Sequence, residues 1–154
     1  MFKVLVPAVA ACALVAFAAR TQSVEPAPET PSMAWRLSYE DSLAKLTYGV
    51  ANSDHLAVMI TCIPGESTAV VYGEAQPDSP RLVRASMGPA ALDPLTGGDA
   101  YETLIPLHDA SLTGLAASGS IRLIGDDGAT VLHADRAEQR LASDFLAYCG
   151  SSRV

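Results

Sequence analysis

Apolar and polar residues alternate along much of the first two thirds of the chain, which is the pattern of β-strands with one buried face. The alternation is clear in residues 35–39 and again in residues 46–50, with an Asp-Ser pair between the two stretches. Residues 55–63, HLAVMITCI, are apolar at almost every position instead. This run predicts a central strand that is covered on both faces.

Further strands are predicted at residues 68–75 and 81–87, joined by the connection Gln-Pro-Asp-Ser-Pro. A loop rich in Gly, Pro and Asp follows at residues 88–99 and leads into a strand at residues 101–107. Because proline cannot donate to a β-ladder, Pro106 confines this strand to an edge of the sheet or marks the strand's end.

The last third of the chain changes character. Residues 109–118 fit a short helix that Gly119 ends. The sequence Asp-Asp-Gly at residues 126–128, between two apolar stretches, predicts a β-hairpin.

Residues 135–150 give the clearest helical pattern. Asp135 can cap the helix, Glu138 three positions later completes an acidic form of the capping box, and Gly150 can end it. The predicted apolar face consists of residues four positions apart, with Tyr148 beside them: Ala137, Leu141, Phe145 and Cys149.

These elements predict a single α+β domain over residues 34–150, with an antiparallel sheet of about five to seven strands. The C-terminal helix is expected to pack on one face of this sheet. Cys62 ends the apolar strand and Cys149 lies on the apolar face of that helix, so packing brings them together. In an oxidising compartment the two would form a disulfide. The alternative is a free, nucleophilic Cys62, but no cationic neighbour in sequence would lower its pKa.

The N-terminus has the pattern of a secretory signal peptide over residues 1–19. Lys3 precedes an uncharged apolar run, and cleavage is expected after Ala18 or Ala19. Export places the protein in the periplasm or outside the cell. A retained membrane anchor is the alternative, although the run is short for a membrane span. Residues 20–33 hold three prolines and no apolar periodicity, which predicts a disordered linker.

Cys12 leaves a further alternative open. The residues before it, Val-Ala-Ala, resemble a bacterial lipobox, in which the cysteine becomes lipidated. A lipid on Cys12 would tether the protein to a membrane as an accessory subunit. The short preceding segment and the apolar residues that follow argue against this.

The charge of the chain narrows the classes of partner. The formal net charge is −7 at pH 7, with no block of Lys or Arg to offset it. Such a protein is repelled by nucleic acid and by anionic lipid surfaces. We therefore expect no nucleic-acid partner.

No motif in the chain points to a catalytic, metal or cofactor site. His55, His108 and His133 stand singly, without the spacing of metal ligands, and the loop acids near glycines are typical of turns. The chain has no nucleophile elbow, phosphate loop or dinucleotide fingerprint. Two strand aromatics, Tyr48 and Tyr72, would form a binding strip for a carbohydrate or a protein if both lie on an outer face.

The layout of the chain resembles small exported proteobacterial proteins of the invasion-associated locus B type. The resemblance rests on a Trp-led first strand, the strand end Thr61-Cys62 followed by Pro64-Gly65, and a closing helix that ends in FLAYC at residues 145–149. It covers most of residues 35–149 and implies secretion and a β-rich domain.

The expected function is that of a non-enzymatic binding or interaction domain in the bacterial periplasm or envelope, with an envelope protein or a small ligand as partner. The alternative is a hydrolase or transferase whose site carries no familiar motif. Converging titratable groups in a pocket would favour the enzyme. An exposed aromatic strip would favour the binding domain.

Overall fold

The computed structural model describes residues 32–84, 91–92 and 99–152. The expected signal peptide, Cys12, nearly all of the expected linker, most of the loop at 88–99 and part of the predicted strand at 81–87 lie outside these residues. Among the described residues, no helix is both long enough and apolar enough to cross a membrane.

The main sheet is antiparallel throughout and has seven strands. This confirms the predicted α+β fold with a sheet of five to seven strands. In spatial order the strands are β1 (Met33–Glu40), β2 (Leu43–Val50), β3 (Leu56–Cys62), β4 (Thr68–Gly73), β8 (Asp99–Pro106) and β6 (Val83–Arg84), and β7 (Ala91–Leu92) also pairs with β8. Pro106 stands at the end of its strand, as its missing N–H requires.

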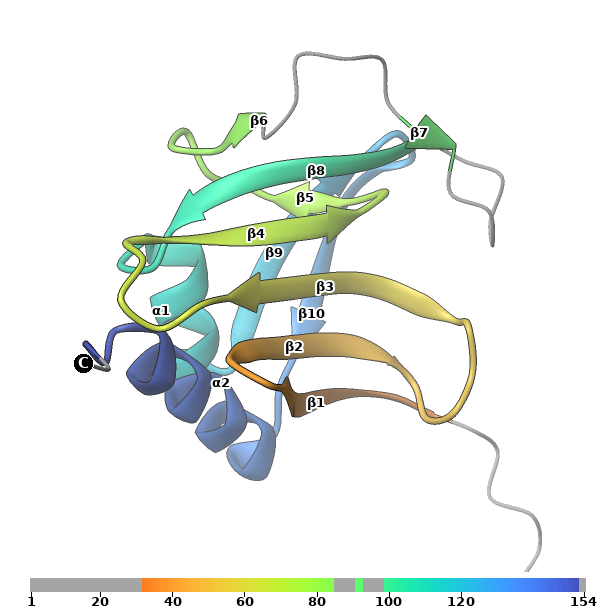
Figure 1. Ribbon diagram of the computed structural model, residues 1–154. Coiled ribbons are helices and arrows are strands. Elements are labelled where there is room, and N and C mark those ends of the chain that lie inside the picture. The colour runs from red at the N-terminus through yellow and green to blue at the C-terminus, as the bar shows by residue number, and fades with distance from the viewer. Residues whose placement is uncertain (1–31, 85–90, 93–98, 153–154) are drawn as a thin grey trace, which may run out of the picture.

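A second, smaller sheet was not predicted. Its order is β10 (Gly128–His133), β9 (Ser120–Gly125) and β5 (Gln76–Pro77). The first two form the predicted hairpin, whereas β5 lies in what the sequence suggested was a plain connection. Figure 1 shows this sheet, α1 (Ala110–Ser118) and α2 (Arg136–Cys149) on one side of the main sheet.

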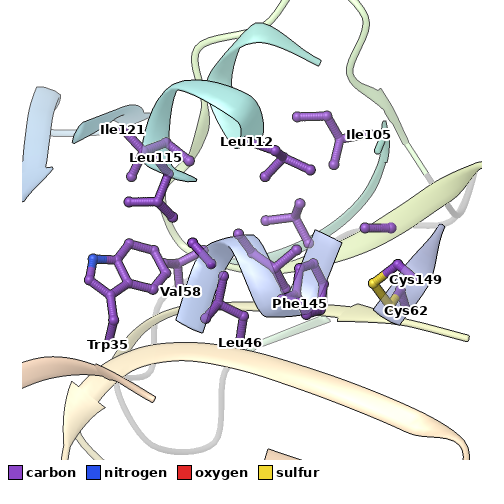
Figure 2. Packing of buried hydrophobic residues seen from close by; sticks show 14 of the residues in the cluster. Trp35, Leu46, Val58, Cys62, Ile105, Leu112, Leu115, Ile121, Phe145 and Cys149 are labelled. Carbon is purple, nitrogen blue, oxygen red and sulfur yellow. A yellow bond between two sulfur atoms is a disulfide. The ribbon is translucent and has the colours of Figure 1, made fainter. Parts of the chain in front are cut away.

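The core lies between the inner face of the main sheet and these elements (Figure 2). Leu46, Val58 and Ile60 of the sheet are buried against residues such as Leu115 of α1 and Phe145 of α2. All belong to one continuous cluster, so the described elements pack around one core.

The strand at residues 55–63 is covered on one face only, so the expectation of two covered faces was wrong. Val58, Ile60 and Cys62 are buried, while Ala57 and Met59 on the other face remain half-exposed. Both helices pack on the face that carries Val58, Ile60 and Cys62. The apolar residues on the opposite face are not covered by either helix.

Helix α2 begins with the predicted capping box. The Asp135 carboxylate accepts hydrogen bonds from the N–H groups of Ala137 and Glu138, and the Glu138 carboxylate accepts one from the N–H of Asp135. Phe145 and Cys149 of the predicted face are buried and Leu141 packs against the core, so this part of the prediction is confirmed. Ala137 is exposed, and Ala142 is buried in its place. Residues repeatedly four apart drift around a helix of 3.6 residues per turn, so Ala137 turns away from the sheet.

Candidate functional site

The cysteines form the predicted disulfide, which attaches the end of β3 to the end of α2. The Cα atoms of Cys62 and Cys149 are 5.8 Å apart, and both side chains are buried. The N–H of Gly65 donates to the carbonyl oxygen of Cys149 at 3.1 Å, so the turn after β3 also binds the helix end. In this state Cys62 has no free thiol and cannot act as a nucleophile.

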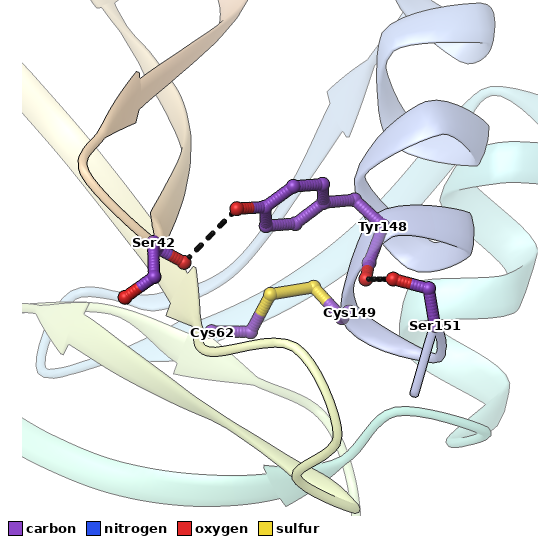
Figure 3. Close-up of a disulfide and its surroundings, with 5 residues drawn as sticks. All are labelled: Ser42, Cys62, Tyr148, Cys149 and Ser151. Carbon is purple, nitrogen blue, oxygen red and sulfur yellow. Dashed lines mark hydrogen bonds between the residues drawn. A yellow bond between two sulfur atoms is a disulfide. The ribbon is translucent and has the colours of Figure 1, made fainter. Parts of the chain in front are cut away.

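The same helix end also contacts the β1–β2 turn, as Figure 3 shows. The hydroxyl of Tyr148 donates to the carbonyl oxygen of Ser42 at 3.2 Å, and the rings of Tyr148 and Tyr39 meet edge to face with centroids 4.9 Å apart. The disulfide therefore belongs to a structural junction of three segments.

The two tyrosines of the expected binding strip point to opposite faces of the main sheet. Tyr48 pairs with Val58 across β2 and β3, while Tyr72 pairs with Met59 across β3 and β4. Since Val58 and Met59 are successive residues of one strand, their side chains lie on opposite faces. Tyr48 thus lies on the inner face, where its ring contacts Trp35 at 5.2 Å between centroids, and only Tyr72 lies on the outer face.

Titratable groups converge at the start of α1, in an open pocket of about 380 Å³. The carboxylate of Asp109 is buried and accepts hydrogen bonds from the Ser79 hydroxyl at 2.7 Å and the Ser111 N–H at 2.9 Å. Burial raises the pKa of Asp109, but these hydrogen bonds and the charge of Arg81 outweigh it and hold the pKa below its ordinary value of 3.8. His108, beside it in sequence, is exposed.

This pocket has the chemistry of a helix cap rather than of a nucleophilic site. A carboxylate with a lowered pKa is a poor general base, because proton transfer to it is unfavourable near neutral pH. Asp109 already has a donor on each oxygen, and its N-cap position accounts for the Ser111 contact. The Ser79 hydrogen bond attaches the segment after β5 to α1.

A metal site finds no support in the part of the chain that the structure describes. No three residues among its His, Cys, Asp and Glu side chains lie close enough to hold a metal ion. His55, His108 and His133 are all exposed and lie on three separate segments.

The outer face of the main sheet carries a continuous group of apolar side chains, which we call the outer patch. Three cross-strand pairs define it: Met59 with Tyr72, Val70 with Leu104, and Val83 with Leu104. Directly opposed residues of an antiparallel sheet have Cβ atoms about 5 Å apart, so the members of each pair are in contact range. Val70 and Tyr72 are two positions apart on β4 and lie on the same face, so they join the pairs into one group. Both helices and the second sheet lie on the other side (Figure 1).

The side chains of the outer patch are partly accessible. Val83 is 61% exposed, and Met59, Val70, Tyr72 and Leu104 are half-buried. Thr47 and Lys45 border the patch on the β2 side, and Glu102 borders it on β8. Of the patch residues, only Tyr72 was predicted from the sequence. Apolar residues on both faces of residues 55–63 and 68–73 were a signal for Met59 and Val70, whereas Val83 and Leu104 lie in other strands.

Comparison of the chain with known protein families, curated protein sequences and solved structures gave no match.

Proposed function

We propose that this protein is an exported, disulfide-stabilised interaction domain of the bacterial envelope that binds another protein through the outer patch. The contiguity of the five patch side chains on the face opposite the helices is the observation that carries this proposal. Apolar and aromatic groups gathered on an open sheet face are typical of protein interfaces, where Met and Tyr are enriched.

A protein partner fits the patch better than a small ligand does. Small-molecule sites are concave and surround most of the ligand. The outer patch is a sheet face, and the pocket at the start of α1 is lined by other residues. The mixed rim of Lys45 and Glu102 around an apolar centre matches the polar rim and apolar core of a protein interface.

Export is supported by the signal pattern of residues 1–19 and by the buried disulfide, which forms and persists in oxidising compartments. The intact mass of the protein from the producing cell tests it, measured after thiol alkylation with and without reduction. We expect a chain that begins near Arg20 and is alkylated only after reduction. Acyl chains on Cys12 would place the protein on a membrane instead, and an uncleaved, reduced chain would contradict export.

Site-specific cross-linking tests the interaction. A photoreactive residue at position 104, in the patch, is compared with one at position 143, which is exposed on α2 on the other side of the main sheet. We expect a specific cross-linked protein from position 104 and not from position 143. Equal products from both positions, or none from position 104, would contradict the proposal.

The partner identified in this way is then purified for binding measurements. We expect Leu104→Lys to weaken its binding at least about tenfold, because it places a charge in the apolar centre. Thr47→Lys adds the same charge at the rim and should change binding by no more than about twofold. Thermal unfolding of both variants confirms that each is folded.

A further inference from the structure

The second sheet ends in a regular, exposed edge strand. β10 lies at one end of the strand order and pairs only with β9 among the described residues. Its pairing with β9 is continuous over all six residues, and five of those six residues are exposed. The strand contains no proline, lysine or bulge, the features that commonly prevent edge strands from pairing with another chain.

The hydrogen bonds around β9 show which backbone groups of β10 face outward. The N–H of Ala134 donates to the carbonyl oxygen of Gly119 at 2.8 Å, at the residue pair that continues the β9–β10 register. In an antiparallel ladder, bonded and non-bonded pairs alternate. The N–H and C=O groups of Ala129, Val131 and His133 therefore point away from β9.

A bond on the opposite side of β9 supports this assignment. The N–H of Asp78 donates to the carbonyl oxygen of Arg122 at 2.9 Å, so the backbone of Arg122 faces β5. Arg122 is the residue paired with Val131. The backbone of Val131 thus faces the open edge.

The edge strand of the main sheet, β1, differs from β10 because one of its outward backbone groups already has a partner within the chain. In β1 the N–H of Trp35 is occupied by the Glu138 carboxylate at 2.8 Å. No hydrogen bond of this kind is found for Ala129, Val131 or His133 within the described part of the chain.

We infer that β10 is a dimerisation edge, at which two copies of this chain join their second sheets in antiparallel orientation. Two copies related by a two-fold axis at Thr130 place Ala129 opposite Val131 of the other copy. Both residues direct their backbone groups outward, so each such pair forms two hydrogen bonds. The pairing is self-complementary, as a two-fold interface requires.

Side chains support this register. In it, the turn residue Asp127 of one copy lies level with His133 of the other, because the two positions lie three residues either side of the axis at Thr130. An imidazole N–H can donate a hydrogen bond to a carboxylate. Val131 and Ile124, each 46% exposed, lie on one face of the hairpin and would continue across the joined sheets.

This edge is separate from the outer patch, so the inference does not depend on the proposed partner. Sedimentation velocity over a wide range of protein concentration tests it on the mature chain at physiological salt. We expect a reversible monomer–dimer equilibrium. Hydrogen exchange should show slower exchange in the peptide that contains β10 as concentration rises. A monomer at all concentrations, without this protection, would overturn the inference.

A proline substitution tests the edge with little effect on the hairpin. Because the N–H of Val131 points away from β9, Val131→Pro removes no hydrogen bond within the chain. We expect it to weaken dimerisation at least about tenfold, whereas Val131→Thr, which keeps the N–H, should retain the dimer. If Val131→Pro unfolds the protein, Val131→Lys at the same position serves as the second variant. Unchanged dimerisation in the folded variant would overturn the assignment.

A charge exchange separates self-pairing from pairing with another protein. His133→Glu should weaken dimerisation because it places a second carboxylate opposite that of Asp127, and Asp127→Lys should weaken it because it removes the acceptor of the His133 imidazole. The double variant places opposite charges within a symmetric pair and should recover the dimer. A double variant as weak as the two single variants combined would contradict the register.

Discussion

Glu138 joins helix α2 to strand β1 by accepting a hydrogen bond from the backbone of Trp35, 103 residues away in sequence. One carboxylate oxygen is 2.8 Å from the Trp35 N–H, and the other is 2.8 Å from the Asp135 N–H. A single side chain thus completes the helix cap and occupies a donor on an edge strand. Charge-assisted hydrogen bonds of this kind are stronger than neutral ones.

The Glu138 contacts predict a graded loss of stability. Glu138→Ala leaves both N–H groups without their acceptor and should lower the free energy of unfolding by about 1–3 kcal/mol. Glu138→Gln keeps one acceptor oxygen and should lose less. Hydrogen exchange at the Trp35 amide gives a local readout, and we expect the fastest exchange in Glu138→Ala. Equal exchange in all three proteins would mean that the Trp35 contact is not maintained in solution.

The disulfide is expected to contribute a large share of the domain's stability. It closes a loop across a sequence separation of 87 residues, and loss of such a bridge typically costs about 2–5 kcal/mol. The double variant Cys62→Ala with Cys149→Ala should show this loss in chemical denaturation. Trp35, the only tryptophan and 2% exposed, reports unfolding through its fluorescence.

Reduction of the unmodified protein is the matched control for this variant. It removes the same bridge without removing the sulfur atoms from the core. Similar losses in both would attribute the effect to the cross-link. A loss confined to the alanine variant would instead attribute it to the packing of the cysteine side chains.

Two glycines near α1 should respond in opposite directions to alanine. Gly119 ends the helix with φ +72°, and an added Cβ would lie 2.5 Å from the carbonyl oxygen of Ala134. Gly119→Ala should therefore cost at least about 1–2 kcal/mol. Gly114 lies inside the helix, where the nearest atom to an added Cβ is 3.7 Å away. Gly114→Ala should stabilise the protein by about 0.5–1 kcal/mol, because alanine favours the helix.

Thermal unfolding of the two glycine variants measures both effects in one assay. Opposite shifts of the melting temperature are expected. A destabilising effect of Gly114→Ala would show that α1 packs more closely at this position than its geometry indicates.

Much of the fold was predictable because its signals are local. The capping box at Asp135, the Asp-Asp-Gly hairpin and the strand periods are each read within a few residues of sequence. The disulfide followed from these local faces together with the number of cysteines. By contrast, β5 contains two residues, Gln76 and Pro77, and no periodicity can identify so short a strand.

The position of β5 is fixed by one local contact and by two contacts that are distant in sequence. The amide of Gln76 donates to the carbonyl oxygens of Gly73 and Tyr101 and accepts a hydrogen bond from the Thr103 hydroxyl at 2.6 Å. The register between strands could not be predicted from the sequence either, and this register places the side chains of Tyr48 and Tyr72 on opposite faces. The outer patch could therefore not be distinguished from the core by composition alone, since both are apolar.

Asp109 predicts the acid sensitivity of the fold. Its pKa lies below 3.8 in the folded protein, because hydrogen bonds from Ser111 and Ser79 outweigh the effect of burial, which raises it. The unfolded chain, with the ordinary value, therefore binds a proton at Asp109 more readily than the folded chain does. The stabilisation is fully present above pH 3.8 and is lost as the pH falls through 3.8 to the lower folded value.

Asp109→Asn isolates this contribution, because asparagine is about as good an N-cap residue as aspartate. The variant should lose about 1 kcal/mol at neutral pH, and its free energy of unfolding should fall less than that of the unmodified protein on acidification. Asp144→Asn, at an exposed position of α2, is the matched change of charge. Denaturation curves at a series of pH values check this. If the difference between Asp109→Asn and the unmodified protein stayed constant down to low pH, the Asp109 charge would not be its cause.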